Sequence, residues 1–337
     1  MNRLRALFGR VVLVGLLTTG CAGGEGDGPP IEFTIPPGAN FDEATDTLVA
    51  RGLVEFRAAF ALRARMAGMD TGIRSGRYEV PLGIGPGPLL DILTSGRVET
   101  VAITIPEGFT VRQIAPRIAA VTGDSPDEVL AMIAPDSAHL SWRVPGPGLE
   151  GYLFPETYRF AEGTSLERVV SELVGTYREY WTPERRVRLD SAGLTEREVV
   201  TLASIVEAEA TFDDEMPMIA SVYMNRVRDN WLLQADPTVL YALGGTRERL
   251  LFAMIDSVAD EPYNTYTQPG LPPGPIGSPG EAALDAALSP AESEYFYFVA
   301  DAQGRHIFSR TLAEHNAAAA EYRRRMFDEP GSDPETP

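Results

Sequence analysis

The chain has 337 residues, of which 44% are hydrophobic and 23% charged, as in ordinary globular proteins with room for two or three domains. The formal net charge is −19, from 29 Lys and Arg against 48 Asp and Glu, and so acidic a surface argues against a nucleic-acid partner. Cys21 is the only cysteine and there are three histidines, which excludes an intrachain disulfide and leads us to expect no metal site.

The first 21 residues predict an export or anchoring signal. Arg3, Arg5 and Arg10 precede or interrupt an apolar stretch whose residues 11–17 are nearly continuous hydrocarbon. About 20 apolar residues are needed to cross a bilayer, so this stretch fits the apolar region of a secretory signal. Small residues before Cys21 resemble a lipoprotein cleavage site, with an uncleaved anchor and full secretion as alternatives. We expect the protein at the cell membrane, with its folded part on the extracytoplasmic (periplasmic) side.

The rest of the chain predicts an α+β protein, in which small N-terminal βα subdomains precede a mainly helical α+β domain. A Pro-Gly-Pro-Gly run at 145–148 marks a boundary, and the acidic, Pro-rich C-terminus is typical of disorder. The expected segments are a tether at 22–30, an N-terminal α+β subdomain at 31–97, a second subdomain at 98–146, the larger domain at 147–327 and a disordered tail at 328–337.

A weak internal repeat opens the folded region. The run Thr-Ile-Pro-Pro-Gly at 34–38 recurs as Thr-Ile-Pro-Glu-Gly at 104–108. Each copy follows a β-type run and precedes a helical pattern, so each predicts a strand–turn–helix unit. Residues 105–115 of the second copy resemble the opening of a LysM module, a βααβ unit that binds N-acetylglucosamine, although any strand–turn–helix unit gives a similar pattern.

Helical patterns dominate the larger domain. A capping box, Thr195 followed by Glu198, begins a helix that we expect to end near Ala210. The other expected elements are helices at 166–180, from 182, at 216–228, 282–288 and 312–326, and the strands of a hairpin at 295–300 and 306–309.

Two glutamates lie near the end of the helix that begins after Thr195. Glu207 and Glu209 flank opposite edges of its apolar stripe and diverge by roughly 160° around the axis. They therefore do not look like the two facing carboxylates of a hydrolytic glycosidase. Glu207 lies beside Val200 and Ala203, and apolar neighbours raise the pKa of a carboxyl toward the value that a general acid needs.

Aromatic side chains alternate with Asn, Gln, Asp, Thr and Glu in several segments, a mixture typical of clefts that bind sugars. Taken singly, each segment is better explained by turns and core aromatics. The candidate substrate-binding or supporting residues are Glu209, Glu150, Tyr152, Glu156, Thr157, Asn225, Gln234, Asp236, Thr238, Tyr263, Asn264, Thr265 and Tyr266.

Together these segments resemble the YceG-like family of endolytic murein transglycosylases over nearly all of the mature chain. The chain departs from the family's pattern at two places. A short apolar run ends at Cys21, where family members usually carry a membrane-spanning helix, and Ala208 stands where a Lys is frequent in the family. The matching blocks are residues 149–158, 202–209, 222–226, 233–241, 263–266, 270–276 and 297–301, with His315 and Asn316.

The resemblance implies a LysM-like subdomain followed by a catalytic domain, with Glu207 of the Ser-Ile-Val-Glu block as the catalytic residue. The implied substrate is the glycan strand of peptidoglycan, cut between N-acetylmuramic acid and N-acetylglucosamine without a cofactor. One carboxyl would protonate the glycosidic oxygen and then accept the proton of the sugar's 6-hydroxyl, which leaves a 1,6-anhydro end. The resemblance also implies a role in ending nascent strands, beside cell-wall synthases.

Two other classes of function compete with this reading. A hydrolytic muramidase would use water in place of the 6-hydroxyl and would need a second carboxylate, for which Glu156 or Asp236 could serve. A glycan-binding or scaffolding lipoprotein, tethered to the envelope and without catalysis, would need no acid/base residue.

Overall fold

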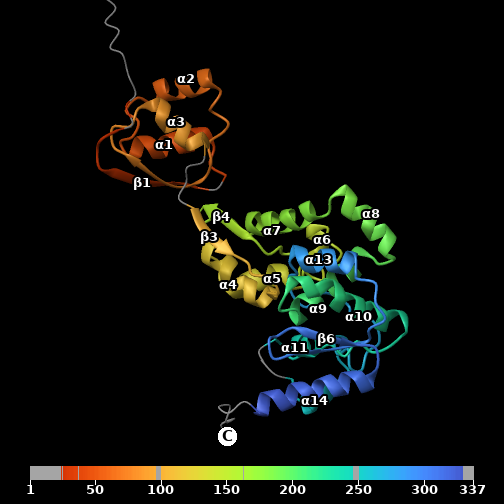
Figure 1. The fold of residues 1–337 in the computed structure, drawn as a ribbon. Helices are drawn as coiled ribbons and strands as arrows, with labels where there is room; N and C mark the ends of the chain where they lie inside the picture. Colours follow the sequence, from red (N-terminus) through yellow and green to blue (C-terminus); the bar gives the residue numbers. More distant parts are fainter. Residues whose placement is uncertain are drawn as a thin grey trace, which may run out of the picture. The chain divides into compact units, whose positions relative to one another are not determined.

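The computed structural model describes residues 24, 26–36, 38–95, 100–161, 163–245 and 250–328. The signal or anchor segment, Cys21 and the tail from 329 onward lie outside these residues. The chain forms two compact units, one up to Glu99 and one from Thr100 (Figure 1). Helices and three two-stranded sheets make up both units, so the α+β fold class is confirmed. None of the helices in the described ranges is long and apolar enough to cross a membrane.

The first unit consists of one two-stranded sheet with helices packed around an apolar core. β1 pairs antiparallel with β2, with Ile31 opposite Val80 and Phe33 opposite Tyr78, and the rings of Phe33 and Tyr78 stack at 5.4 Å. The elements are β1 (Pro30–Ile35), α1 (Phe41–Ala50), α2 (Arg57–Ala67), β2 (Gly76–Pro81) and α3 (Pro86–Ser95).

The second unit holds one continuous core that extends from Ile103 to Leu288. Its elements are β3 (Thr100–Thr104), α4 (Val111–Thr122), α5 (Pro126–Ile133), α6 (Ala138–Trp142), β4 (Thr157–Ala161), α7 (Leu166–Tyr180), α8 (Pro183–Ala192), α9 (Glu196–Glu209), the 3₁₀ helix η1 (Asp213–Glu215), α10 (Met216–Arg228), α11 (Asp236–Ala242), α12 (Phe252–Ser257), α13 (Glu281–Leu288), β5 (Tyr297–Ala300), β6 (His306–Ser309) and α14 (Leu312–Asp328).

β3 pairs antiparallel with β4, and α4 and α5 lie between these strands in the chain. The second strand of this sheet therefore lies beyond the range 98–146 expected for the LysM-like subdomain. The boundary at 146 and the glycan-binding role of this segment stay predictions.

Helix α9 forms the centre of the second unit. All eight residues from Val199 to Val206 are buried, because α10, α11 and α13 pack around the helix. Thr195 and Glu198 form the expected capping box, in which each backbone N–H donates to the other residue's side chain. A buried, capped helix of this kind holds its last turn in a fixed position for the side chains described below.

Gly151 lies where the loop before β4 passes close to α9. Its φ is +80°, and a Cβ atom there would come within 2.5 Å of the Pro275 side chain and 3.1 Å of Val200. Gly193, with φ +69°, has no atom within 4 Å of the corresponding position. We expect Gly193→Ala to lower the free energy of unfolding by about 1 kcal/mol, through left-handed strain alone. Gly151→Ala should cost about 1–3 kcal/mol more because of overpacking. Urea titration of both variants measures the difference, and equal losses would contradict the close approach.

Candidate active site

The last turn of α9 presents two carboxyls to different surroundings. Glu207 and Glu209 are two residues apart, which separates them by roughly 160° on a helix. The Glu207 carboxylate accepts a hydrogen bond from the backbone N–H of Gly280 at 3.0 Å. The Glu209 carboxylate accepts one from the Tyr223 hydroxyl of α10 at 2.7 Å. The divergence expected from the sequence is therefore confirmed.

Glu207 lies where the turn after β3 meets the loop before α13. The Gly108 N–H donates to Ser278 O at 2.8 Å, and the Ser278 N–H donates to Phe109 O at 2.9 Å. Burial raises the pKa of Glu207 to about 7, the Gly280 hydrogen bond opposes that rise, and the negative charges of Glu107 and Asp213 add to it. Glu207 lines neither of the two cavities described next.

Glu209 lines a cavity of about 450 Å³, here called the Glu209 cavity. Burial raises the pKa of Glu209 to about 7, and the negative charge of Asp236 adds to that rise. The hydrogen bond from Tyr223 and the positive charge of Arg226 oppose the rise. Four candidate residues meet here: Glu209, Gln234, Asp236 and Tyr266. The other walls are Tyr223, Arg226, residues 297–300, His306, Leu312 and His315.

Hydrogen bonds fix the walls of the Glu209 cavity. The Tyr266 hydroxyl donates to the Asp236 carboxylate at 2.5 Å. The buried Arg226 guanidinium donates to the backbone carbonyls of Leu233 at 2.5 Å and Phe296 at 2.7 Å, which joins α10 to the segments on either side of the cavity. The ring of Tyr297 lies 5.6 Å from the same guanidinium. These contacts hold aromatic rings and polar groups around Glu209 before any ligand binds.

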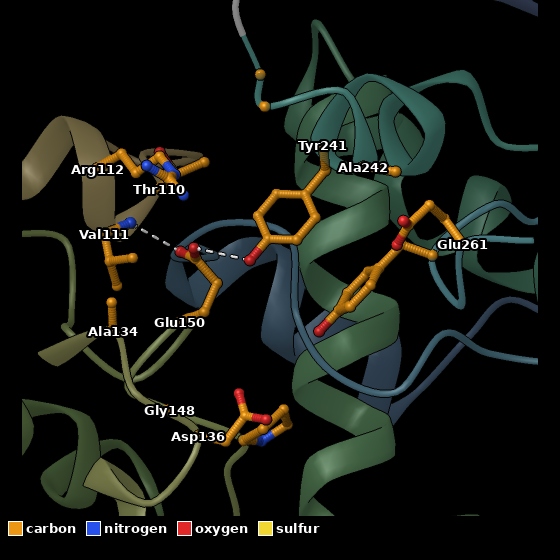
Figure 2. Close-up of a pocket in the computed structure, with 14 residues that line it drawn as sticks. Thr110, Val111, Arg112, Ala134, Asp136, Gly148, Glu150, Tyr241, Ala242 and Glu261 are labelled. Atoms are coloured by element: carbon orange, nitrogen blue, oxygen red, sulfur yellow. Dashed lines mark hydrogen bonds between the residues drawn. The ribbon is translucent and has the colours of Figure 1, made fainter. Parts of the chain in front are cut away.

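A second cavity, of about 320 Å³, surrounds Glu150 (Figure 2). The buried Glu150 carboxylate accepts from the Val111 N–H at 2.9 Å and from the Tyr241 hydroxyl at 3.2 Å, and burial raises its pKa to about 7. The rings of Tyr241 and Tyr263 lie 4.9 Å apart. Glu150 and Tyr263 are the candidate residues that this cavity brings together. Glu150 thereby connects the start of α4 to α11.

The remaining candidate residues lie apart from both cavities. Four of them are buried and make hydrogen bonds within the fold: Tyr152, Thr238, Asn264 and Thr265. The Asn264 amide, for example, donates to Ile255 O and Val258 O. Glu156 and Thr157 are exposed at the start of β4. The Asn225 amide donates to Ser293 O and Tyr295 O, both at 3.0 Å. Roles of these residues in substrate binding stay predictions.

The sequence did not point to several walls of the Glu209 cavity. Arg226, Tyr297 and His315 fall inside the matching blocks but are not among the candidate residues, and His306 is one of the three histidines in the chain. The matching blocks and the scarcity of histidine were the available signals, but no local spacing connects these residues with Glu209. Within the ranges that the structure describes, no three His, Cys, Asp or Glu side chains are grouped so as to hold a metal ion.

A carboxyl whose pKa is near 7 can give up a proton and take one back at neutral pH. In the Glu209 cavity such a carboxyl lies with aromatic rings, an amide, a guanidinium and a second carboxylate, a set of groups suited to acid/base chemistry on a polar ligand.

Comparison with known proteins places the chain in a family. The model of the YceG-like family matches residues 33–321, and the chain belongs to that family. An endolytic murein transglycosylase of Bacillus subtilis is 33% identical, with 87% of this chain and 84% of the relative covered. One from Streptococcus pneumoniae is 30% identical, and the match spans 86% of this chain but 57% of the longer relative. The crystal structure of a yceG-like protein from Listeria monocytogenes matches with a TM-score of 0.59 at 32% identity, covering 86% of this chain and 99% of that one.

Proposed function

We propose that the protein is a peptidoglycan lytic transglycosylase. Membership of the YceG-like family and the names of its relatives, endolytic murein transglycosylases, support the class of reaction. The observation that carries the proposal is the Glu209 cavity, in which a carboxyl with a pKa of about 7 faces a space of about 450 Å³. Ligand pockets in proteins have volumes of about 300–1,000 Å³.

The last turn of α9 offers two candidates for the acid/base residue. The resemblance assigns Glu207, and burial gives both carboxyls the same raised pKa, about 7. Glu209 lines the Glu209 cavity and Glu207 lines neither of the two cavities described above, and a general acid must come within hydrogen-bond reach of the bond that it breaks. We therefore propose Glu209 as the acid/base, and Glu207 is the competing assignment that the paired variants in the Discussion test.

The proposed reaction needs one carboxyl. The protonated acid donates its proton to the glycosidic oxygen, and the bond from that oxygen to the anomeric carbon of N-acetylmuramic acid breaks. N-acetylglucosamine leaves with a free 4-hydroxyl. The carboxylate then takes the proton of the 6-hydroxyl, whose oxygen bonds to the anomeric carbon and closes the 1,6-anhydro ring. Every proton that the carboxyl gives up is recovered, so the residue ends as it began.

A hydrolytic muramidase is the second candidate, and one observation favours it. Asp236 shares the Glu209 cavity and could hold a water molecule on the opposite side of the sugar, as inverting glycosidases require. Glu156, the other carboxylate considered for this role, is exposed at β4 and accepts a hydrogen bond from the N–H of Thr157 at 2.8 Å.

Product analysis separates the two reactions. The protein lacking its first 21 residues should release fragments with 1,6-anhydro ends from uncross-linked glycan strands, as mass spectrometry detects. Fragments with reducing ends would support the muramidase instead. Binding to sacculi and to uncross-linked strands without any release would support a glycan-binding protein.

We further propose that the protein acts outside the cytoplasm and ends growing strands. The basic and apolar N-terminus, with Cys21 after small residues, supports attachment to the membrane. Metabolic labelling with a fatty acid should mark the wild type and not Cys21→Ser. A wild type that takes up no label would favour an uncleaved anchor or full secretion.

A further inference from the structure

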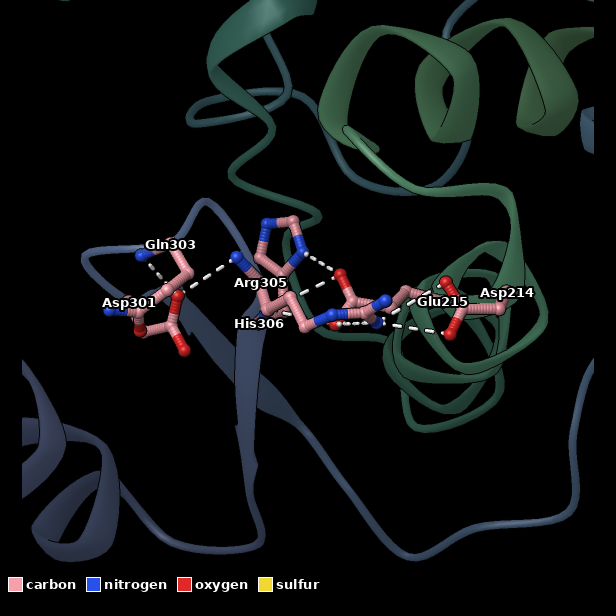
Figure 3. A network of polar contacts seen from close by, with 6 residues as sticks. All are labelled: Asp214, Glu215, Asp301, Gln303, Arg305 and His306. Atoms are coloured by element: carbon pink, nitrogen blue, oxygen red, sulfur yellow. Dashed lines mark hydrogen bonds and ion pairs between the residues drawn. The ribbon is translucent and has the colours of Figure 1, made fainter.

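His306 and Glu215 form a buried pair beside the Glu209 cavity (Figure 3). Their side chains are only 6% and 10% exposed. The Glu215 carboxylate lies 3.0 Å from His306 Nδ1 and accepts from the His306 backbone N–H at 3.1 and 3.2 Å. It also pairs with Arg305 at 3.4 Å. One carboxylate therefore fixes both the backbone and the ring of His306.

Neighbouring groups also contact the His306 ring and the turn before it. The ring of Phe298, on the neighbouring strand β5, meets it edge to face at 5.1 Å. The turn between β5 and β6 is closed by Asp301, whose carboxylate accepts from the backbone N–H groups of Gln303 and Arg305 at 2.8 and 2.9 Å. Because β6 begins at His306, this turn sets the position of the histidine along the cavity wall.

In a neutral His306 ring, the pairing determines which nitrogen carries the proton. A carboxylate that is ionised can only accept hydrogen bonds, so in that state Nδ1–H donates to Glu215 and Nε2 is left as an acceptor. Figure 3 shows one ring nitrogen facing Glu215 and the other facing away from it. Within the described chain, Nε2 has no hydrogen-bond partner, although His306 lines the Glu209 cavity.

We propose that His306 is a substrate-contacting residue of the Glu209 cavity, whose Nε2 accepts a hydrogen bond from a sugar hydroxyl, and that Glu215 is its positioning residue. The inference rests on the proposed function and adds a contact to it. The ligand at this wall is an uncharged N-acetylated sugar of the glycan strand. A peptide carboxylate cannot donate a hydrogen bond to Nε2, and the Asp236 carboxylate in the same cavity disfavours an anionic ligand.

Two substitutions of His306 separate this role from a purely structural one. The amide of His306→Asn lies near the place of Nδ1, so it can keep the Glu215 contact while the Nε2 acceptor is lost. The amide of His306→Gln reaches the place of Nε2, so its oxygen can accept the sugar hydroxyl while the Glu215 contact is lost. Steady-state cleavage of uncross-linked glycan strands gives kcat and KM for each variant, and thermal unfolding gives its Tm.

We expect His306→Asn to retain a Tm near that of the wild type and to lose about 10-fold in kcat/KM, the loss of about one hydrogen bond to an uncharged group. His306→Gln should lie within about 3-fold of wild type in kcat/KM despite a lower Tm. The reverse order, with His306→Asn active and His306→Gln inactive, would overturn the proposal and assign His306 a purely structural role. Equal kcat/KM values in both variants and the wild type would also overturn it. If the wild type itself cuts no strands, the proposed function is contradicted. That outcome is distinct from the two results for the His306 variants that would overturn the role of His306.

Discussion

Glu209→Gln is expected to lower the rate of glycan-strand cleavage by at least about 100-fold, since general acid/base catalysis contributes about 10²–10⁴-fold. The amide has the shape of the carboxyl and can still accept the hydrogen bond that the Tyr223 hydroxyl now donates at 2.7 Å. The fold should therefore persist while the transferable proton is lost. Release of 1,6-anhydro fragments, followed by mass spectrometry, measures the rate.

Glu207→Gln is the matched control on the same turn of α9. Its amide oxygen can accept from the Gly280 N–H as the carboxylate does at 3.0 Å, and the loss of charge removes repulsion from Glu107 and Asp213. We expect this variant to keep activity within about 5-fold of wild type. The substitution replaces a hydrogen bond from the Gly280 N–H to a carboxylate by one to an uncharged amide oxygen, which is a small change in free energy. The opposite ranking, with Glu207→Gln inactive and Glu209→Gln active, would return the acid/base role to Glu207.

The free energy of unfolding should fall as the pH rises from about 4.5 to about 7. Burial raises the pKa of Glu150 from 4.5 to about 7 in the folded protein. A raised pKa means that the folded state binds the proton more tightly than the unfolded state does. The resulting stability is fully present below pH 4.5 and is lost as the pH passes 7. For Glu150 alone the loss is on the order of 3 kcal/mol, and Glu207 and Glu209 act in the same direction.

Glu150→Gln isolates this contribution. The amide resembles the protonated acid, so the variant should unfold at higher denaturant concentration than wild type at pH 8 and show a flatter dependence on pH. Urea titrations at pH 5 and pH 8 measure both effects. Glu156→Gln, at an exposed carboxyl, is the control and should follow the wild type. A Glu150→Gln variant that is less stable than wild type at pH 8 would show that the ionised carboxylate is the better partner for Val111 and Tyr241.

Local signals were sufficient for much of the fold. Helix α10 has the expected bounds, Met216–Arg228, and the capping box at Thr195 begins α9. Strand β4 is absent from the predicted elements because its first two residues, Thr157 and Tyr158, belong to the block at 149–158 that is interpreted as sugar-binding, whereas Tyr158 and Phe160 are buried. Helices α11 and α12 have 7 and 6 residues, too few for a helical period to be recognised.

The candidate site was only partly predictable, for a geometric reason. Glu209 and Asp236 could be found because both lie in blocks where polar and apolar residues alternate in a recognisable order. His306 and His315 come from β6 and α14, about 100 residues beyond α9 in the chain, and only the tertiary fold brings them to the same cavity. Sequence spacing also could not show that Asn264, a candidate for substrate binding, is fully buried and donates to backbone carbonyls at the end of α12.

The burial of α9 sets an order of events during synthesis of the chain. The core of the first unit is complete once α3, which ends at Ser95, has been made, so this unit can fold while the ribosome is still making the rest. The apolar faces of α9 stay uncovered for longer, because α13, which packs on it, begins at Glu281. Nascent chains that stop between residues 210 and 280 should therefore aggregate or bind chaperones, whereas chains that stop just after residue 99 should remain soluble.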